Sequence, residues 1–268
     1  MHLKSTILIA FLAIGCLSCK KSGTTNPEEK KETRKVLDRI IQVSADQPAN
    51  SASFVNLSYD EKGGLTSIKA PSYEYIYTYK LNQLSLISYK TTTGEVIREV
   101  TYENNQIKRI TSVFSTPGLP KKTVVHECYY EGNKLTGVER IESGLVIAKY
   151  TYQYSGDRFV KTIVKDAVYE TVFDYTFDDK KHIHHGIDYA TVQIMNLIDV
   201  RASMPNNMLT QKYALYQDGV KRQSDETSYQ YTYDADGYPI TCIKTWIHPS
   251  RTAPEITRYT YEYKILEI

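Results

Sequence analysis

Apolar and polar positions alternate in short runs over residues 36–268, and each run ends at a polar turn. Tyrosines recur two residues apart before a turn of Asn, Asp or Gly, and two aliphatic residues three positions apart follow it. One such unit runs from Tyr79 through Asn82 to Leu84 and Ile87. A period of two predicts strands, and Asn, Asp and Gly supply the left-handed conformations of tight turns. The pattern predicts an antiparallel meander of hairpins, in which each strand pairs with its neighbour along the chain.

The aliphatic pair after each turn does not fit a regular strand, because residues i and i+3 lie on opposite faces. Either a bulge after the turn resets the register, or both faces are covered because the sheet curls on itself. We therefore expect an all-β fold with one large sheet, curled or forming a half-barrel. Leu37 and Ile40 resemble the outgoing half of a unit, and Tyr261 and Tyr263 resemble an incoming half.

Residues 182–209 interrupt the repeat, and a short helix is expected over residues 190–198. This insert is interpreted either as a plug that covers one face of the sheet or as a binding element, since function concentrates where regular structure is interrupted. Its candidate binding residues are His182, His184, His185, Tyr189 and Met195. In a strand, His182 and His184 would share a face, but no further ligand completes a zinc site, so no metal or cofactor is predicted.

The longest apolar run covers residues 6–15, which is too short to span a membrane and follows the positive charge of Lys4. This arrangement is typical of a signal peptide. The run leads into the sequence GCLSCKK, which resembles the lipobox of bacterial lipoproteins, where a cysteine thiol receives a diacylglycerol. Cys19 is the predicted attachment residue and Cys16 the alternative. We expect a signal peptide over 1–18, a flexible tether over 19–35 and one β domain over 36–268.

Composition narrows the function classes. Basic and acidic residues are balanced at a net charge of +2 and form no long blocks, so nucleic acid is not an expected partner. The chain has 24 Tyr against 6 Phe, and tyrosine suits a half-buried strand because its ring packs while its hydroxyl stays in water. Cys128 and Cys242 lie in strand-like runs, where buried thiols are favoured over a disulfide. No catalytic motif is found, so the chain is not predicted to be an enzyme.

Residues 233–239 (YDADGYP) resemble a YD (RHS-type) repeat. The chain as a whole resembles the tyrosine-rich repeat lipoproteins of Gram-negative bacteria that are grouped as domains of unknown function. The resemblance implies an extracytoplasmic β-sheet protein and transfers no catalytic residue.

The expected function is a non-catalytic binding or scaffold lipoprotein of the cell envelope. Its lipid would hold it at the outer membrane, on the periplasmic or the surface side, and its partner would be an envelope protein or glycan. One alternative is a hydrolase with its site near His182–His185. The other is a repeat-shell module that encloses a partner, which would require a closed interior.

Overall fold

The computed structural model describes residues 32–45, 52–185 and 206–268, and Glu32–Ile268 form one compact unit. In these ranges the chain forms strands and turns, and no helical segment could cross a membrane. The strands are β1 (Thr33–Ser44), β2 (Ser53–Tyr59), β3 (Leu65–Ala70), β4 (Tyr73–Lys80), β5 (Gln83–Thr91), β6 (Glu95–Glu103), β7 (Gln106–Ser115), β8 (Lys122–Glu131), β9 (Lys134–Glu142), β10 (Leu145–Ser155), β11 (Arg158–Asp166), β12 (Tyr169–Phe177), β13 (Met208–Gln217), β14 (Val220–Tyr233), β15 (Pro239–Ile247) and β16 (Glu255–Glu267).

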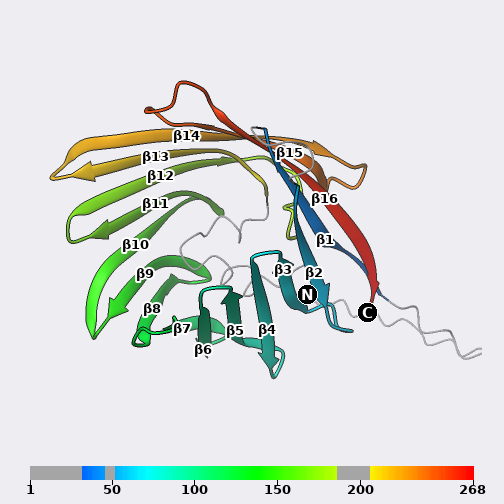
Figure 1. The fold of residues 1–268 in the computed structure, drawn as a ribbon, viewed down its shortest axis with the longest axis horizontal. Helices are drawn as coiled ribbons and strands as arrows, with labels where there is room; N and C mark the ends of the chain where they lie inside the picture. Colours follow the sequence, from blue (N-terminus) through cyan, green and yellow to red (C-terminus); the bar gives the residue numbers. More distant parts are fainter. Residues whose placement is uncertain (1–31, 46–51, 186–205) are drawn as a thin grey trace, which may run out of the picture. The chain divides into compact units, whose positions relative to one another are not determined.

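The strands form an antiparallel meander that closes into a barrel (Figure 1). Each strand pairs with its neighbours along the chain, and β1 also pairs with β16. The predicted all-β meander of hairpins is therefore confirmed. The prediction of a curled or half-barrel sheet is corrected, because hydrogen bonding between the first and last strands leaves the sheet without a free edge.

The barrel closes because its first and last strands are the two halves of one repeat unit. Leu37 of β1 lies opposite Tyr263 of β16, and the register shifts directly after Leu37. Within the chain, Leu84 lies opposite Tyr79 and the register shifts at the same point of the hairpin. The end strands thus pair in the same way as an internal hairpin.

A bulge after each tight turn explains the aliphatic pair at i and i+3. The register shifts by one residue next to the turn in the β4–β5 and β6–β7 hairpins, among others. The extra residue on the outgoing strand brings both aliphatic side chains to the same face. Leu84 and Ile87 are accordingly 1% and 0% exposed, and Ile107 and Ile110 are 3% and 2% exposed.

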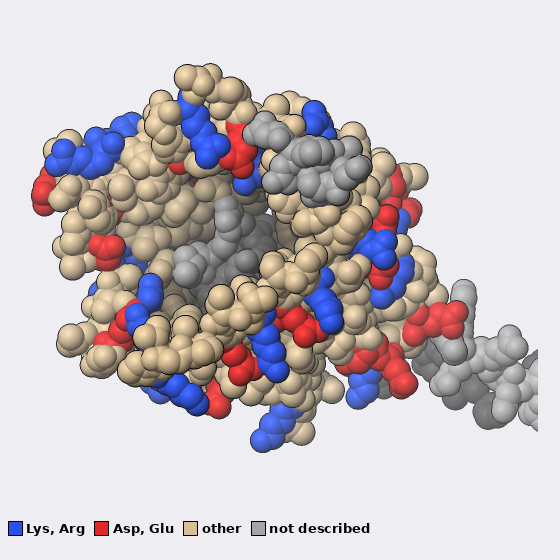
Figure 2. All heavy atoms as spheres, viewed as in Figure 1, with Lys and Arg blue, Asp and Glu red and all other residues tan. Residues whose placement is uncertain are grey.

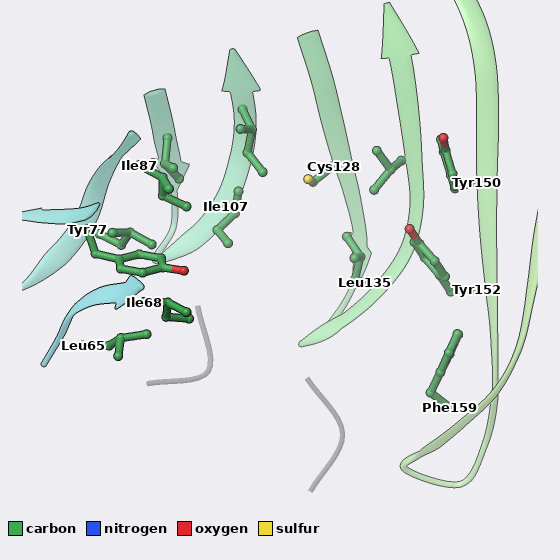
Figure 3. Close-up of a cluster of buried hydrophobic side chains, with 14 of the residues drawn as sticks. Leu65, Ile68, Tyr77, Ile87, Ile107, Cys128, Leu135, Tyr150, Tyr152 and Phe159 are labelled. Atoms are coloured by element: carbon green, nitrogen blue, oxygen red, sulfur yellow. The ribbon is translucent and has the colours of Figure 1, made fainter. Parts of the chain in front are cut away.

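The buried side chains lie on the inner face of the barrel (Figure 3). Phe159 of β11 is fully buried, and its ring contacts those of Tyr152, Tyr154 and Tyr175 at centroid distances of 5.2–5.8 Å. These aromatic contacts join β10, β11 and β12 along the inner wall.

The interruption of the repeat lies between the end of β12 at Phe177 and the start of β13. Its predicted end is two residues too late, because Met208 and Leu209 already belong to β13. Tyr189, Met195 and the expected helix over 190–198 lie outside the described residues.

The N-terminal boundary also differs from the expectation. β1 begins at Thr33, inside the segment predicted to be a tether over 19–35. The barrel register explains this difference, since Thr33, Arg34 and Lys35 continue the pairing with β16. The predicted signal peptide over 1–18 and both candidate lipid-bearing cysteines lie outside the described residues.

Candidate functional site: the barrel interior

The outer face of the barrel carries charged side chains that pair across neighbouring strands. Arg109 of β7 lies 2.5 Å from Glu127 of β8, and alternates along its strand with the buried Ile110. Lys149 of β10 similarly lies 2.7 Å from Glu139 of β9. Further outward pairs are Lys69–Glu74, Lys90–Glu95, Lys161–Asp174 and Arg39–Glu262. Figure 2 shows basic and acidic side chains intermixed over the visible face.

Exposed ion pairs of this kind add little to the free energy of unfolding, but their position indicates whether water or lipid surrounds the barrel. A transmembrane barrel carries an apolar band about 25 Å tall on its outside, where each Lys or Arg at the midplane costs about 2–4 kcal/mol. The outward charged pairs on β1, β16 and the strands from β3 to β12 favour an outer face in water.

The inner face carries most of the tyrosines of the described strands, and several of their hydroxyl groups donate to backbone carbonyl oxygens. Tyr79 donates to the carbonyl oxygen of Leu65 at 3.0 Å, and Tyr102 donates to that of Leu84 at 2.9 Å. The same contact recurs from Tyr59 to Leu37, from Tyr154 to Leu135 and from Tyr263 to Pro239.

Each accepting carbonyl in this series belongs to the residue directly before a register shift, where the bulge disturbs the ladder of hydrogen bonds. The tyrosine of the next unit therefore adds a hydrogen bond to the backbone at the bulge, where the ladder is irregular. Phenylalanine could pack in the same place but could not donate, which favours tyrosine at these positions.

A cavity of about 560 Å³ lies inside the barrel. Eight tyrosines from β4, β5, β14 and β16 line it, together with aliphatic side chains of β1, β2 and β3 and with Ile183 and His184. The rings of Tyr75 and Tyr89 stack at a centroid distance of 4.4 Å. The hydroxyl oxygen of Tyr77 is buried and has no hydrogen-bond partner in the described part of the chain. The cavity is therefore mostly aromatic and aliphatic with a few polar atoms, which is the usual make-up of a small-molecule site.

The three histidines predicted as binding residues lie in a turn after β12, not in a strand. The His182 and His184 rings are 5.3 Å apart, whereas His185 is exposed and packs edge-on against Tyr238. Burial lowers the pKa of His184 to about 4. Only His184 of this cluster lines the cavity. Among the described residues, no group of three His, Cys, Asp or Glu side chains is arranged to hold a metal ion.

Asn207 connects the two ends of the insert by hydrogen bonds. This role was not predicted from the sequence. Asn207 is 1% exposed, and its side-chain amide donates to the carbonyl oxygen of Lys181 (2.8 Å) and to the Asp178 carboxylate (3.1 Å). Its side-chain oxygen accepts the N–H of Ile183 at 3.1 Å. The Tyr233 hydroxyl donates to the same Asp178 carboxylate, so the network ties the insert to β14.

The two cysteines of the barrel are buried and free. Burial raises the pKa of Cys128 to about 12 and that of Cys242 to about 11, so neither thiol is reactive at neutral pH. The expectation of buried thiols rather than a disulfide is confirmed.

A polar cluster on the inner wall was also missed from the sequence. Arg98 of β6 lies opposite Ser112 of β7, and His126 of β8 lies opposite Arg140 of β9. Ser112 and His126 are 1% and 6% exposed. Burial and the charges of Arg140 and Arg98 lower the pKa of His126 to about 4, while Glu142 acts in the opposite direction.

The depressed pKa of His126 predicts acid destabilisation. The folded state favours neutral His126. Its contribution to the free energy of unfolding is therefore complete above the unfolded pKa of about 6.5 and is lost as pH falls toward 4. The loss should reach roughly 2–3 kcal/mol, since one pKa unit corresponds to about 1.4 kcal/mol. Urea unfolding at pH 7 and pH 4.5 measures it, with His126→Phe as the control. Equal losses in both proteins would show that His126 does not titrate as described.

No known family profile and no curated protein sequence matches this chain. Its structure is similar to the crystal structure of a porin-like protein from Bacteroides uniformis, with a TM-score of 0.56, 14% identity, and coverage of 85% of this chain and 96% of that chain. It is also similar to a porin-like protein from Bacteroides vulgatus, with a TM-score of 0.55, 12% identity, and coverage of 86% and 99%. Likeness at these identities extends to the barrel fold alone.

Proposed function

We propose that this chain is a non-catalytic, lipid-anchored binding protein of the cell envelope, which holds an apolar or aromatic ligand inside its barrel. The observation that carries the proposal is the polarity of the wall, which is charged outside and aromatic inside. Because the ion pairs such as Arg109–Glu127 belong in water, the barrel stands outside the bilayer and the lipid supplies the attachment.

The closed barrel provides the interior that the alternative, an enclosing shell, would require. Its cavity of about 560 Å³, however, has the size of a small-molecule site and is too small for a protein partner. The YD-repeat resemblance, a partner protein or glycan, and the side of the outer membrane stay predictions.

Ligand binding is tested with N-phenyl-1-naphthylamine, an uncharged aromatic probe whose fluorescence rises in apolar surroundings. The full-length protein should bind this probe, and the fluorescence should saturate as the probe concentration rises. Tyr75→Lys, which places a charge in the cavity wall, should abolish the signal, whereas Thr78→Lys on the outer face of the same strand should leave it unchanged. Equal loss or retention in both variants would reject the interior as the binding site.

Lipid attachment is tested by replacing the two candidate cysteines. The Cys16→Ala, Cys19→Ala double variant should release the protein from membranes or accumulate as precursor, because the proposed acyl chains attach it to the membrane. Each single variant identifies the acceptor, and Cys19→Ala is expected to have the larger effect. Membrane fractionation with carbonate washing measures the outcome, and full retention of the double variant would contradict the proposal.

A further inference from the structure

Three side chains of β6, β8 and β9 have buried nitrogen atoms for which the described residues supply no hydrogen-bond partner. They are Nε and Nη1 of Arg98, both ring nitrogens of His126, and Nε of Arg140. Buried polar groups in folded proteins are nearly always bonded, so a group of unpaired donors at one place calls for an explanation. A buried guanidinium group whose nitrogen atoms are only partly bonded is unfavourable, because burial removes water from a full charge.

The register of β6, β7, β8 and β9 brings these donors together. Arg98 lies opposite Ser112, and Ile110, two residues earlier on β7, lies opposite His126. His126 in turn lies opposite Arg140. This register places the three side chains in one region of the wall, and both arginine charges act on the His126 ring.

The positive charge of this region is only partly neutralised. Glu142 accepts a hydrogen bond from Arg140, but Lys122 also contacts its carboxylate at 2.5 Å. In the described part of the chain, Arg98 forms no ion pair with a carboxylate. Arg140 and Lys122 therefore share the Glu142 carboxylate, while Arg98 has no acidic partner in the described ranges.

This region adjoins the cavity. The charge of Arg98 acts on the hydroxyl of Tyr75, where it opposes the rise in pKa that burial causes. Tyr75 lines the cavity and stacks on Tyr89, which does the same. A ligand that rests against these rings could extend one end to Arg98.

We propose that Arg98, His126 and Arg140 bind an oxyanion, a carboxylate or its sulfonate or phosphate equivalent, on a ligand whose apolar body occupies the cavity. Guanidinium groups donate in a fork that matches two oxygens of such a group, and neutral His126 donates through one ring nitrogen. The inference rests on the proposed function, since it concerns the charged end of the ligand whose apolar body fills the cavity. The ligand class is an amphipathic organic anion.

Two probes that differ by one group test this assignment. 8-Anilinonaphthalene-1-sulfonate has the aromatic body of N-phenyl-1-naphthylamine with a sulfonate added. Arg98→Gln should weaken binding of the sulfonate at least about tenfold, as expected for a lost charge-assisted hydrogen bond, and should change binding of the neutral probe less than about twofold. Arg140→Gln should act in the same direction. Arg109→Gln, on the outer face of β7, is the matched control and should affect neither probe.

The melting temperature separates this role from a structural one. If Arg98 serves an anion, Arg98→Gln should melt at or above the temperature of the unaltered protein without ligand, because a buried unpaired charge has been removed. Unchanged sulfonate affinity, or equal weakening of both probes, would overturn the anion site while leaving the cavity proposal intact. Failure of the unaltered protein to bind either probe would overturn both.

Discussion

Replacing Asn207 by Ala is expected to destabilise the barrel by about 3–5 kcal/mol. The substitution removes the two hydrogen bonds that the side-chain amide donates and the one that its oxygen accepts. The N–H of Ile183, the carbonyl of Lys181 and the Asp178 carboxylate each lose this partner in a partly buried place. Each lost partner costs about 1–3 kcal/mol. Urea unfolding at neutral pH measures the change.

The neighbouring residue supplies a matched control. Asn206 donates a single hydrogen bond to the carbonyl oxygen of Lys180 in an exposed place, so Asn206→Ala should cost less than about 1 kcal/mol. Similar losses for the two variants would show that the Asp178–Asn207 network does not fasten the insert.

Replacing Phe159 by Ala is the second change with a large expected effect. Its side chain is 0% exposed and contacts three aromatic rings from two neighbouring strands. Removing a buried phenylalanine side chain costs about 3–5 kcal/mol through lost transfer energy and the cavity left behind. Thermal and urea unfolding should both show the loss. Leu145→Ala, at a position that is 69% exposed, should change stability by less than about 0.5 kcal/mol.

The local structure was readable from the sequence, because alternation and turn residues act over a few positions. Tyr79, Asn82 and Leu84 predicted a hairpin, and β4 and β5 form it. Closure was not readable, because pairing of β1 with β16 joins residues at opposite ends of the chain. Leu37 and Tyr263 carried the signal as unmatched half-units, and recognising that two halves complete one unit would have predicted the barrel.

The inner-wall cluster was missed although its signal was present. Arg98 is in phase with Val100 and Tyr102 on β6, and His126 is in phase with Cys128 on β8. A charged residue in phase with an apolar face must lie inward with it, since side chains alternate strictly along a strand. Attention to histidine clustering drew the prediction to the insert instead.

The Asn207 contacts lay beyond any sequence argument. They depend on where a turn after β12 and the residue before β13 meet in space, and no periodicity constrains irregular backbone. The proposed binding role of Tyr189 and Met195 stays a prediction, because both residues lie outside the described ranges.

The central claim is that the outer face of this barrel lies in water and its apolar face points inward. Single cysteines at Glu99 and Thr151, which are exposed at mid-strand, and at Val100, which is 7% exposed, test it most directly. In full-length lipidated protein on opened membranes, with Cys128 and Cys242 replaced by Ser, a hydrophilic maleimide should label Glu99→Cys and Thr151→Cys within minutes and without detergent. Val100→Cys should stay unlabelled until the protein is unfolded. Outer-face cysteines that react only after detergent is added would place the barrel wall in lipid and contradict the account.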